Sequence, residues 1–111
     1  MSNTYTFSEY ESSARETACY PKGKGMEYAL LGGCGEMGEL ANKYKKVIRG
    51  DKVFDAEFKK NMADELGDVM WYMASIAYEL DVSLEDVAKN NIKKLHSRKE
   101  RGVIKGDGDN R

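Results

Sequence analysis

Apolar residues recur every three or four positions along most of the chain, which is the spacing that places them on one face of an α-helix. The pattern is clearest between about residues 55 and 80. The apolar positions that keep this rhythm are Phe58, Met62, Leu66, Val69, Met73 and Ile76. This stretch therefore predicts a long amphipathic helix whose apolar face lies in the core.

Two earlier helices are predicted from the signals at their ends. Ser8 and Glu11 have the spacing of a capping box, and Pro21 is expected to end the helix that begins near Ser8. The second helix is expected from about residue 26 to 48. It should end at Gly50, because glycine readily adopts the left-handed conformation that terminates helices.

A fourth helix is predicted near the carboxyl end of the chain. Ser83 can cap its first turn, with Asp86 as its capping partner, and the helix should end before Gly102. The residues of this helix that are expected to face the core are Val87, Ile92 and Leu95. No segment shows the alternation of apolar and polar residues that is typical of a strand.

These segments predict an all-α fold, in which four helices with short connections pack as a bundle. Residues 1–111 are expected to form a single domain that ends in a polar tail at about 102–111. The third helix is apolar on most sides around residues 70–73. Such a helix needs neighbours on most sides, and it could be the central helix of a monomeric bundle. Because one short bundle has few faces to cover it, we expect the chain to assemble as a homo-oligomer.

The composition is that of a globular protein and narrows the function classes. The 111 residues include 33% charged residues, and the formal net charge is −1, which argues against a duplex nucleic-acid binder. No apolar run is long enough to span a membrane. The only candidates for a zinc site are Cys19, Cys34 and His96, and they lack paired ligand spacing. Without a secretory signal segment, free thiols in a reducing cytoplasm are expected rather than a disulfide.

A glycine-rich stretch within the second predicted helix contains Gly-x-Gly-x-x-Gly at residues 33–38. A dinucleotide-binding loop would need a strand before the glycines and a second strand after them, and neither context is convincing here. A Walker loop would need Gly-Lys-Ser/Thr, but Glu39 and Leu40 follow Gly38. A phosphate-binding loop is therefore not favoured, whereas a kink of the helix at Gly32 and Gly33 stays open.

Two pairs of carboxylates carry the most informative spacing. Glu36 and Glu39 lie three residues apart, as do Glu65 and Asp68, so each pair shares one helix face. For either helix alone, a solvated polar face is the simpler interpretation. However, apolar residues flank the second pair, and clustered carboxylates require a neutralising cation. Ligands that are all oxygen favour Mg²⁺, with Mn²⁺ as the alternative.

Cationic and polar residues follow the same helical spacing. Lys43 continues the face of Glu36 and Glu39, and a further stripe on the fourth helix consists of Asn91, Lys94 and Arg98. Magnesium held by carboxylates usually keeps positions for phosphate and water. Lysine and arginine would pair with the remaining phosphate oxygens. The combination indicates cleavage of a phosphoanhydride bond.

The sequence resembles the MazG-like all-α nucleoside triphosphate pyrophosphohydrolases. The resemblance rests on the Glu-x-x-Glu and Glu-x-x-Asp motifs at residues 36–39 and 65–68, on the block 91–98, and on the ending 106–111. It covers nearly the whole chain, and these four blocks in this order are fairly specific. It implies a small single-domain member of that family.

The resemblance also implies the roles of individual residues. The catalytic metal ligands for Mg²⁺ would be Glu36, Glu39, Glu65 and Asp68. The contacts to phosphate or sugar would be Lys43, Asn91, Lys94 and Arg98. Tyr72 is a candidate contact to sugar or base, although packing in the core or an interface is its default role.

The implied reaction is hydrolysis of a nucleoside or deoxynucleoside triphosphate between the α- and β-phosphates by a metal-activated water. The products would be a nucleoside monophosphate and pyrophosphate, and the enzyme would be a homodimer or homotetramer. Two alternatives stay open. One is a related all-α hydrolase acting on dUTP or phosphoribosyl-ATP, and the other is a non-catalytic helical interaction module.

Overall fold

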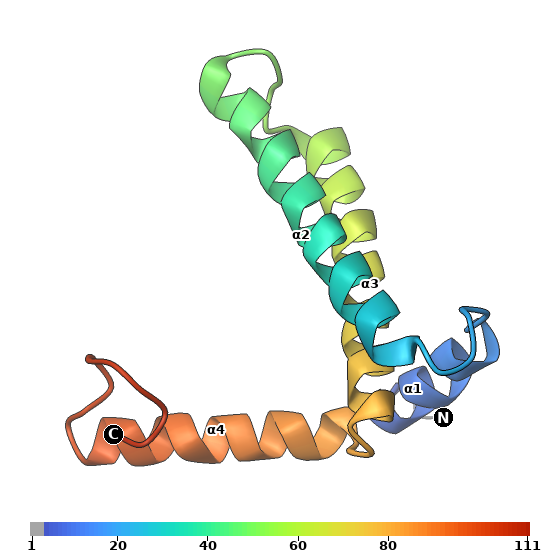
Figure 1. Cartoon of the computed structure of the whole chain (residues 1–111). Coiled ribbons are helices and arrows are strands. Elements are labelled where there is room, and N and C mark those ends of the chain that lie inside the picture. The colour runs from blue at the N-terminus through green and yellow to red at the C-terminus, as the bar shows by residue number, and fades with distance from the viewer. Residues whose placement is uncertain (1–3) are drawn as a thin grey trace.

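The computed structural model describes residues 4–111, which form four α-helices and no strand (Figure 1). The helices are α1 (Phe7–Glu16), α2 (Gly25–Arg49), α3 (Ala56–Glu79) and α4 (Leu84–Glu100). The prediction of an all-α fold is confirmed. The first three residues of the predicted domain lie outside the described residues.

The start of α1 differs from the predicted capping box. Thr6 is the capping residue, and its Oγ1 atom accepts a hydrogen bond of 3.1 Å from the backbone N–H of Glu9. Ser8 lies inside α1, so the predicted box of Ser8 and Glu11 is wrong. Glu11 instead caps a different helix, because its Oε1 atom accepts a 3.0 Å hydrogen bond from the N–H of Leu84 at the start of α4.

The end of α1 also comes before Pro21. The helix ends at Glu16, and the hydroxyl of the next residue, Thr17, donates to the carbonyl of Ala14 at 2.7 Å. The same hydroxyl accepts a 2.7 Å hydrogen bond from the indole N–H of Trp71 on α3. A tertiary contact therefore accompanies the end of this helix, and helix propensity alone does not reveal it.

The other predicted helix ends agree with the structure. Gly50 closes α2 in the left-handed conformation with φ of 92°. The Oγ atom of Ser83 accepts a 3.1 Å hydrogen bond from the N–H of Asp86 at the start of α4. Asp55 caps α3 in the same way, accepting a 2.9 Å bond from the N–H of Phe58.

Helices α2 and α3 run antiparallel along their length and form the longest contact in the chain (Figure 1). The glycine-rich stretch lies inside α2, which continues unbroken from Gly25 to Arg49. The helix therefore does not end at Gly32 and Gly33, and no phosphate-binding loop forms there.

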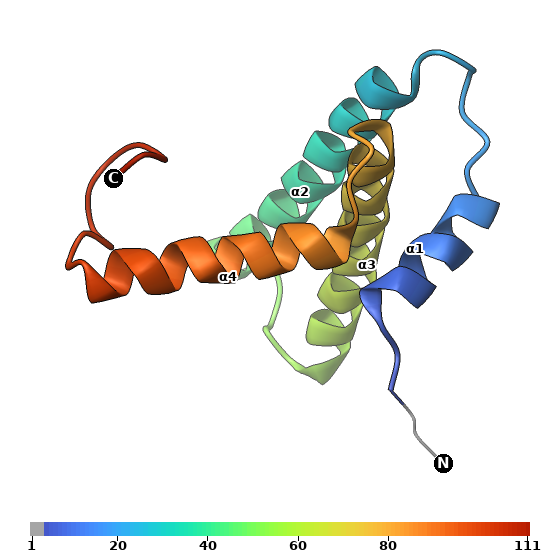
Figure 2. The ribbon, with the colours of Figure 1, turned by 90° about the horizontal axis from the view of Figure 1, so that it is seen from below.

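Helix α4 extends away from the α2–α3 pair, so the four helices do not close into a bundle within one chain (Figures 1 and 2). Among the helices of residues 4–111, α4 contacts only α1 and α3. The radius of gyration is 17.2 Å, whereas a compact domain of this length would measure about 13 Å. The single chain is an open arrangement of helices.

The core of the single chain is correspondingly small. Its main cluster consists of Ala14, Ala74, Ala77 and Leu84, with Tyr10 and Trp71 packed against it. Val69 is buried as predicted. The predicted core residues that are instead exposed are Leu66, Met73, Val87 and Ile92. Sequence spacing places these four residues with the core positions but cannot reveal whether a neighbour covers them, so their exposure was not predicted. No helix within residues 4–111 is long and apolar enough to cross a membrane.

Candidate active site

Three of the four predicted metal ligands meet at the contact between α2 and α3. One carboxylate oxygen from each of Glu36, Glu65 and Asp68 lies within 4.8 Å of the others. Glu36 comes from α2, and the other two lie one turn apart on α3. The antiparallel pairing of the two helices thus brings together carboxylates that are about thirty residues apart in the sequence.

Glu39 does not contribute an oxygen to this group, and its side chain is exposed. It nevertheless lies close enough for its charge to help raise the pKa of Glu36. The structure therefore places Glu39 at the edge of the cluster, one turn along α2 from Glu36.

The surroundings of Glu36 disfavour its charged form. Hydrogen bonding with Glu65 raises the pKa of Glu36 above its ordinary value, and burial and the charges of Glu39, Glu65 and Asp68 add to this effect. Its Oε2 atom is buried and has no hydrogen-bond partner among residues 4–111. A buried carboxylate oxygen without a donor, facing two further carboxylates, fits a divalent cation with oxygen ligands.

Lys43 places a cation at the acidic cluster. Its Nζ atom lies 2.9 Å from Oε1 of Glu65, and both side chains are partly buried. The hydrogen bond from Lys43 lowers the pKa of Glu65 below its ordinary value. Lys43, predicted as a phosphate contact, is thus positioned at the cluster but paired with one of its carboxylates.

Aromatic rings extend from the acidic cluster toward the start of α2. The ring of Tyr72 packs against Gly32, and its centroid lies 6.2 Å from that of Tyr28. Tyr28 in turn stacks on Tyr20, with centroids 5.2 Å apart. Burial raises the pKa of Tyr72, and the neighbouring Tyr28 contributes. The sequence analysis missed Tyr28, although its four-residue spacing to Gly32 and then to Glu36 places all three on one face of α2.

The polar stripe of α4 is not brought to the acidic cluster within the chain. Helix α4 leaves the α2–α3 pair at its first turn, and its later turns lie far along the separate arm (Figure 1). Asn91 is exposed. Lys94 and Arg98 contact Asp109 of the tail. The predicted phosphate contacts on α4 therefore remain separate from the carboxylates in a single copy.

Residues 26–103 match the family model of the MazG nucleotide pyrophosphohydrolase domain. The chain belongs to this family. The match includes nearly all of α2 and the whole of α3 and α4, and with them the acidic cluster and the cations of α4. Helix α1 and residues 104–111 lie outside the part that defines the MazG domain.

A relative in a bacterial virus is similar along nearly the whole chain. The sequence is 48% identical over 109 residues to the "Gene 37 protein" of Mycobacterium phage L5, covering 92% of this chain and 96% of the phage protein. The similarity thus extends beyond the MazG domain itself. No solved structure gives a significant match.

Proposed function

We propose that this MazG family member hydrolyses nucleoside or deoxynucleoside triphosphates between the α- and β-phosphates, giving a nucleoside monophosphate and pyrophosphate. The observation that carries the proposal is the cluster of Glu36, Glu65 and Asp68 oxygens within 4.8 Å of one another in a MazG domain. A domain that only bound other helices would have no need for a buried carboxylate oxygen without a partner.

The cluster would hold Mg²⁺, or Mn²⁺ in its place, through Glu36, Glu65 and Asp68, with Glu39 as the fourth carboxylate. The bound metal would lower the pKa of a coordinated water and offset charge on the phosphates. Lys43 keeps Glu65 ionised through their 2.9 Å contact. With a metal held at Glu65, the Lys43 ammonium group would be available to contact a phosphate oxygen.

The aromatic rings indicate where the nucleoside would lie. A triphosphate held at the carboxylates has its sugar and base within reach of the neighbouring rings, and Tyr72 and Tyr28 offer the nearest aromatic surface. Stacking on an aromatic ring tolerates different bases, because every base has a π face. We therefore assign the sugar or base contact to Tyr72, with Tyr28 beside it.

The cations of α4 would be supplied by a second copy of the chain. Residues 93–111 contain seven Lys or Arg and three Asp or Glu side chains, whereas the whole chain has a net charge of −1. The arm that carries Asn91, Lys94 and Arg98 is therefore basic, and the remainder is acidic. We propose a homodimer or homotetramer in which this arm meets the acidic cluster of a neighbouring copy. Such packing would also cover the exposed apolar residues of α3 and α4.

Release of pyrophosphate from a panel of nucleotides tests the function. We expect Mg²⁺-dependent turnover of at least one nucleoside triphosphate, detected by adding inorganic pyrophosphatase and measuring phosphate. Asp68→Asn and Glu39→Gln should abolish this turnover, and Asp64→Asn should preserve it, because Asp64 pairs with Lys60 on the exposed side of α3. Turnover of only dUTP or phosphoribosyl-ATP would assign the narrower substrate. Absence of turnover with every nucleotide would favour the non-catalytic alternative.

Both cysteines, Cys19 and Cys34, are free and exposed. Free exposed thiols fit a reducing compartment, and we place the protein in the cytoplasm on that ground.

A further inference from the structure

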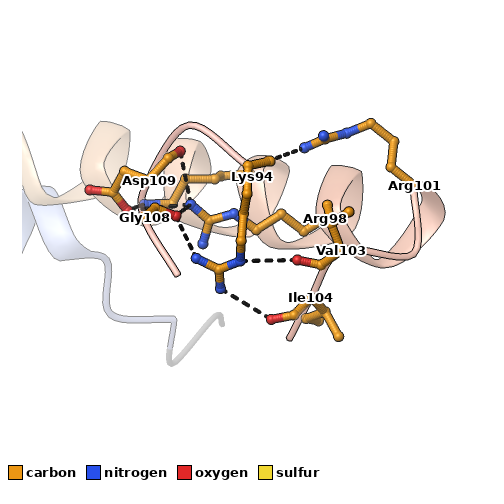
Figure 3. Close-up of polar contacts among 8 residues, drawn as sticks. Lys94, Arg98, Arg101, Val103, Ile104, Gly108 and Asp109 are labelled. Atoms are coloured by element: carbon orange, nitrogen blue, oxygen red, sulfur yellow. Dashed lines mark hydrogen bonds and ion pairs between the residues drawn. The ribbon is translucent and has the colours of Figure 1, made fainter. Parts of the chain in front are cut away.

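The tail after α4 folds back along the helix and is held by arginine side chains (Figure 3). The guanidinium group of Arg111 donates hydrogen bonds to the carbonyl oxygens of Val103 at 3.0 Å, Ile104 at 3.1 Å and Gly108. Arg101 donates to the backbone oxygen of Arg111 at 2.8 Å. Residues 103–111 therefore form a loop that is closed on itself and tied to the end of α4.

This loop places a carboxylate on two cations of α4. One Asp109 oxygen lies 3.3 Å from Nζ of Lys94 and 3.3 Å from Nη2 of Arg98 (Figure 3). The same Nη2 atom also donates to the backbone oxygens of Asp109 at 2.9 Å and Gly108 at 3.4 Å. The two cations lower the pKa of Asp109. An anion-binding site on α4 is therefore filled by the chain itself.

The fit between Arg98 and the tail is incomplete. The Arg98 side chain is only 5% exposed, but its Nε atom is buried and finds no acceptor in the described part of the chain. All three of its contacts use one nitrogen, although a guanidinium group can bind two oxygens side by side. An anion with more oxygens and more charge than a carboxylate would satisfy Arg98 better. A phosphate group has both properties.

Asp109 can leave the site at low cost. Its side chain is 85% exposed, so separating it from Lys94 returns a well-hydrated carboxylate to water. Ion pairs of so exposed a carboxylate contribute little to stability, because water screens the charges. The contacts of Arg111 with backbone carbonyls do not depend on the Asp109 side chain. The tail therefore stays attached and keeps the Asp109 carboxylate near Lys94 and Arg98.

We propose that the tail is a built-in competitor of the substrate, in which the Asp109 carboxylate occupies the place of a phosphate on Lys94 and Arg98. The inference rests on the proposed function, because that function gives these two cations their role toward phosphate. Asp109 lies outside residues 26–103, the part of the chain that matches the MazG family model. Binding of a triphosphate displaces Asp109, and removal of the Asp109 charge favours binding.

Binding of inorganic triphosphate to the metal-free full-length protein tests the competition without any turnover. Titration calorimetry should show that Asp109→Asn binds triphosphate about two- to fivefold more tightly than the wild type, the range expected for loss of an exposed ion pair. Asp107→Asn is the matched control, because it removes the same charge from the same tail without any contact to Lys94 or Arg98 in the described residues. In a Lys94→Gln background, the gain from Asp109→Asn should shrink.

The outcomes separate the competitor from the proposed function. Equal or weaker binding by Asp109→Asn, or an equal gain in both aspartate variants, overturns the competitor. If nucleotides are then still hydrolysed, the proposed function stands. If Asp109→Asn binds triphosphate more tightly but no nucleotide is hydrolysed, the proposed function is wrong. Competition between Asp109 and phosphate for Lys94 and Arg98 then still stands. Absence of triphosphate binding in all variants overturns the anion site itself.

Discussion

Gly32 of α2 lies directly beneath the aromatic ring of Tyr72 on α3. A Cβ atom at position 32 would come within 2.2 Å of Cε1 and 2.4 Å of Cζ of that ring. The missing side chain thus lets the ring settle against the backbone of α2, next to the acidic cluster. The neighbouring glycines differ, because Cβ atoms at Gly35 and Gly38 would meet no atom within 4 Å.

Alanine substitutions should therefore have opposite effects along the same helix. Gly32→Ala must displace the Tyr72 ring, and we expect it to lower the free energy of unfolding by about 1–3 kcal/mol, as overpacking does. Gly35→Ala should raise it by up to about 1 kcal/mol, since alanine favours the helix and has room. Urea denaturation followed by circular dichroism measures both. A loss of stability in Gly35→Ala would show that a neighbouring copy covers that position.

The glycines also show what sequence could predict and what it could not. Helix periodicity and capping residues predicted four helices, because these signals act over a few residues. The spacing of three residues within each carboxylate pair predicted that Glu65 and Asp68 share a face, which holds at the contact with Glu36. The close approach of the Tyr72 ring to Gly32 could not be predicted in this way, because Tyr72 lies forty residues further along the chain.

The position of α4 escaped prediction for a related reason. Its amphipathic pattern predicts an apolar face, but the pattern does not say which surface covers that face. Val87 and Ile92 are exposed in the single chain, and the Glu11 side chain that caps α4 comes from α1. The direction of the helix therefore depends on contacts between segments that are distant in sequence, and on other copies in the proposed assembly.

If the acidic cluster binds a metal, removing that metal should lower the stability of the folded protein. A cation that binds only the folded protein stabilises it by about 2.7 kcal/mol when its free concentration is a hundred times its dissociation constant. We expect Mg²⁺ to raise the melting temperature of the wild type and EDTA to reverse this. Asp68→Asn should lose the response. Asp64→Asn should keep it, because that residue lies outside the cluster and pairs with Lys60. An unchanged response in Asp68→Asn would place the metal elsewhere.

The pKa of Glu36 predicts how the metal-free protein responds to pH. Because this pKa is raised in the folded state, chiefly by hydrogen bonding with Glu65, the folded protein holds the Glu36 proton more tightly than the unfolded chain. The resulting stabilisation is fully present below the ordinary pKa of a glutamate and is lost as pH rises through the raised value. The contribution of Glu65 to stability depends on pH in the opposite direction, because Lys43 lowers the pKa of Glu65. That contribution is present at neutral pH and is lost as pH falls through the lowered pKa.

Glu36→Gln should therefore stabilise the protein in EDTA at neutral pH, and the advantage should diminish as the solution becomes mildly acidic. Thermal melts across this range measure the difference from wild type. Glu27→Gln serves as the control, because Glu27 is exposed on α2, away from the acidic cluster, and pairs with Lys24. A Glu36→Gln variant that is less stable than wild type at neutral pH would contradict the electrostatic account of the cluster.

The proposed assembly can be tested by mixing two inactive variants. If the site combines the carboxylates of one copy with Arg98 of another, Asp68→Asn and Arg98→Gln chains should each be inactive alone. After unfolding and refolding together, half of the dimers are mixed. Each mixed dimer holds one intact site and one doubly altered site, so activity should recover to about a quarter of the wild-type value. If both groups serve a site within one chain, no mixture recovers activity, and the division of the site between copies is wrong.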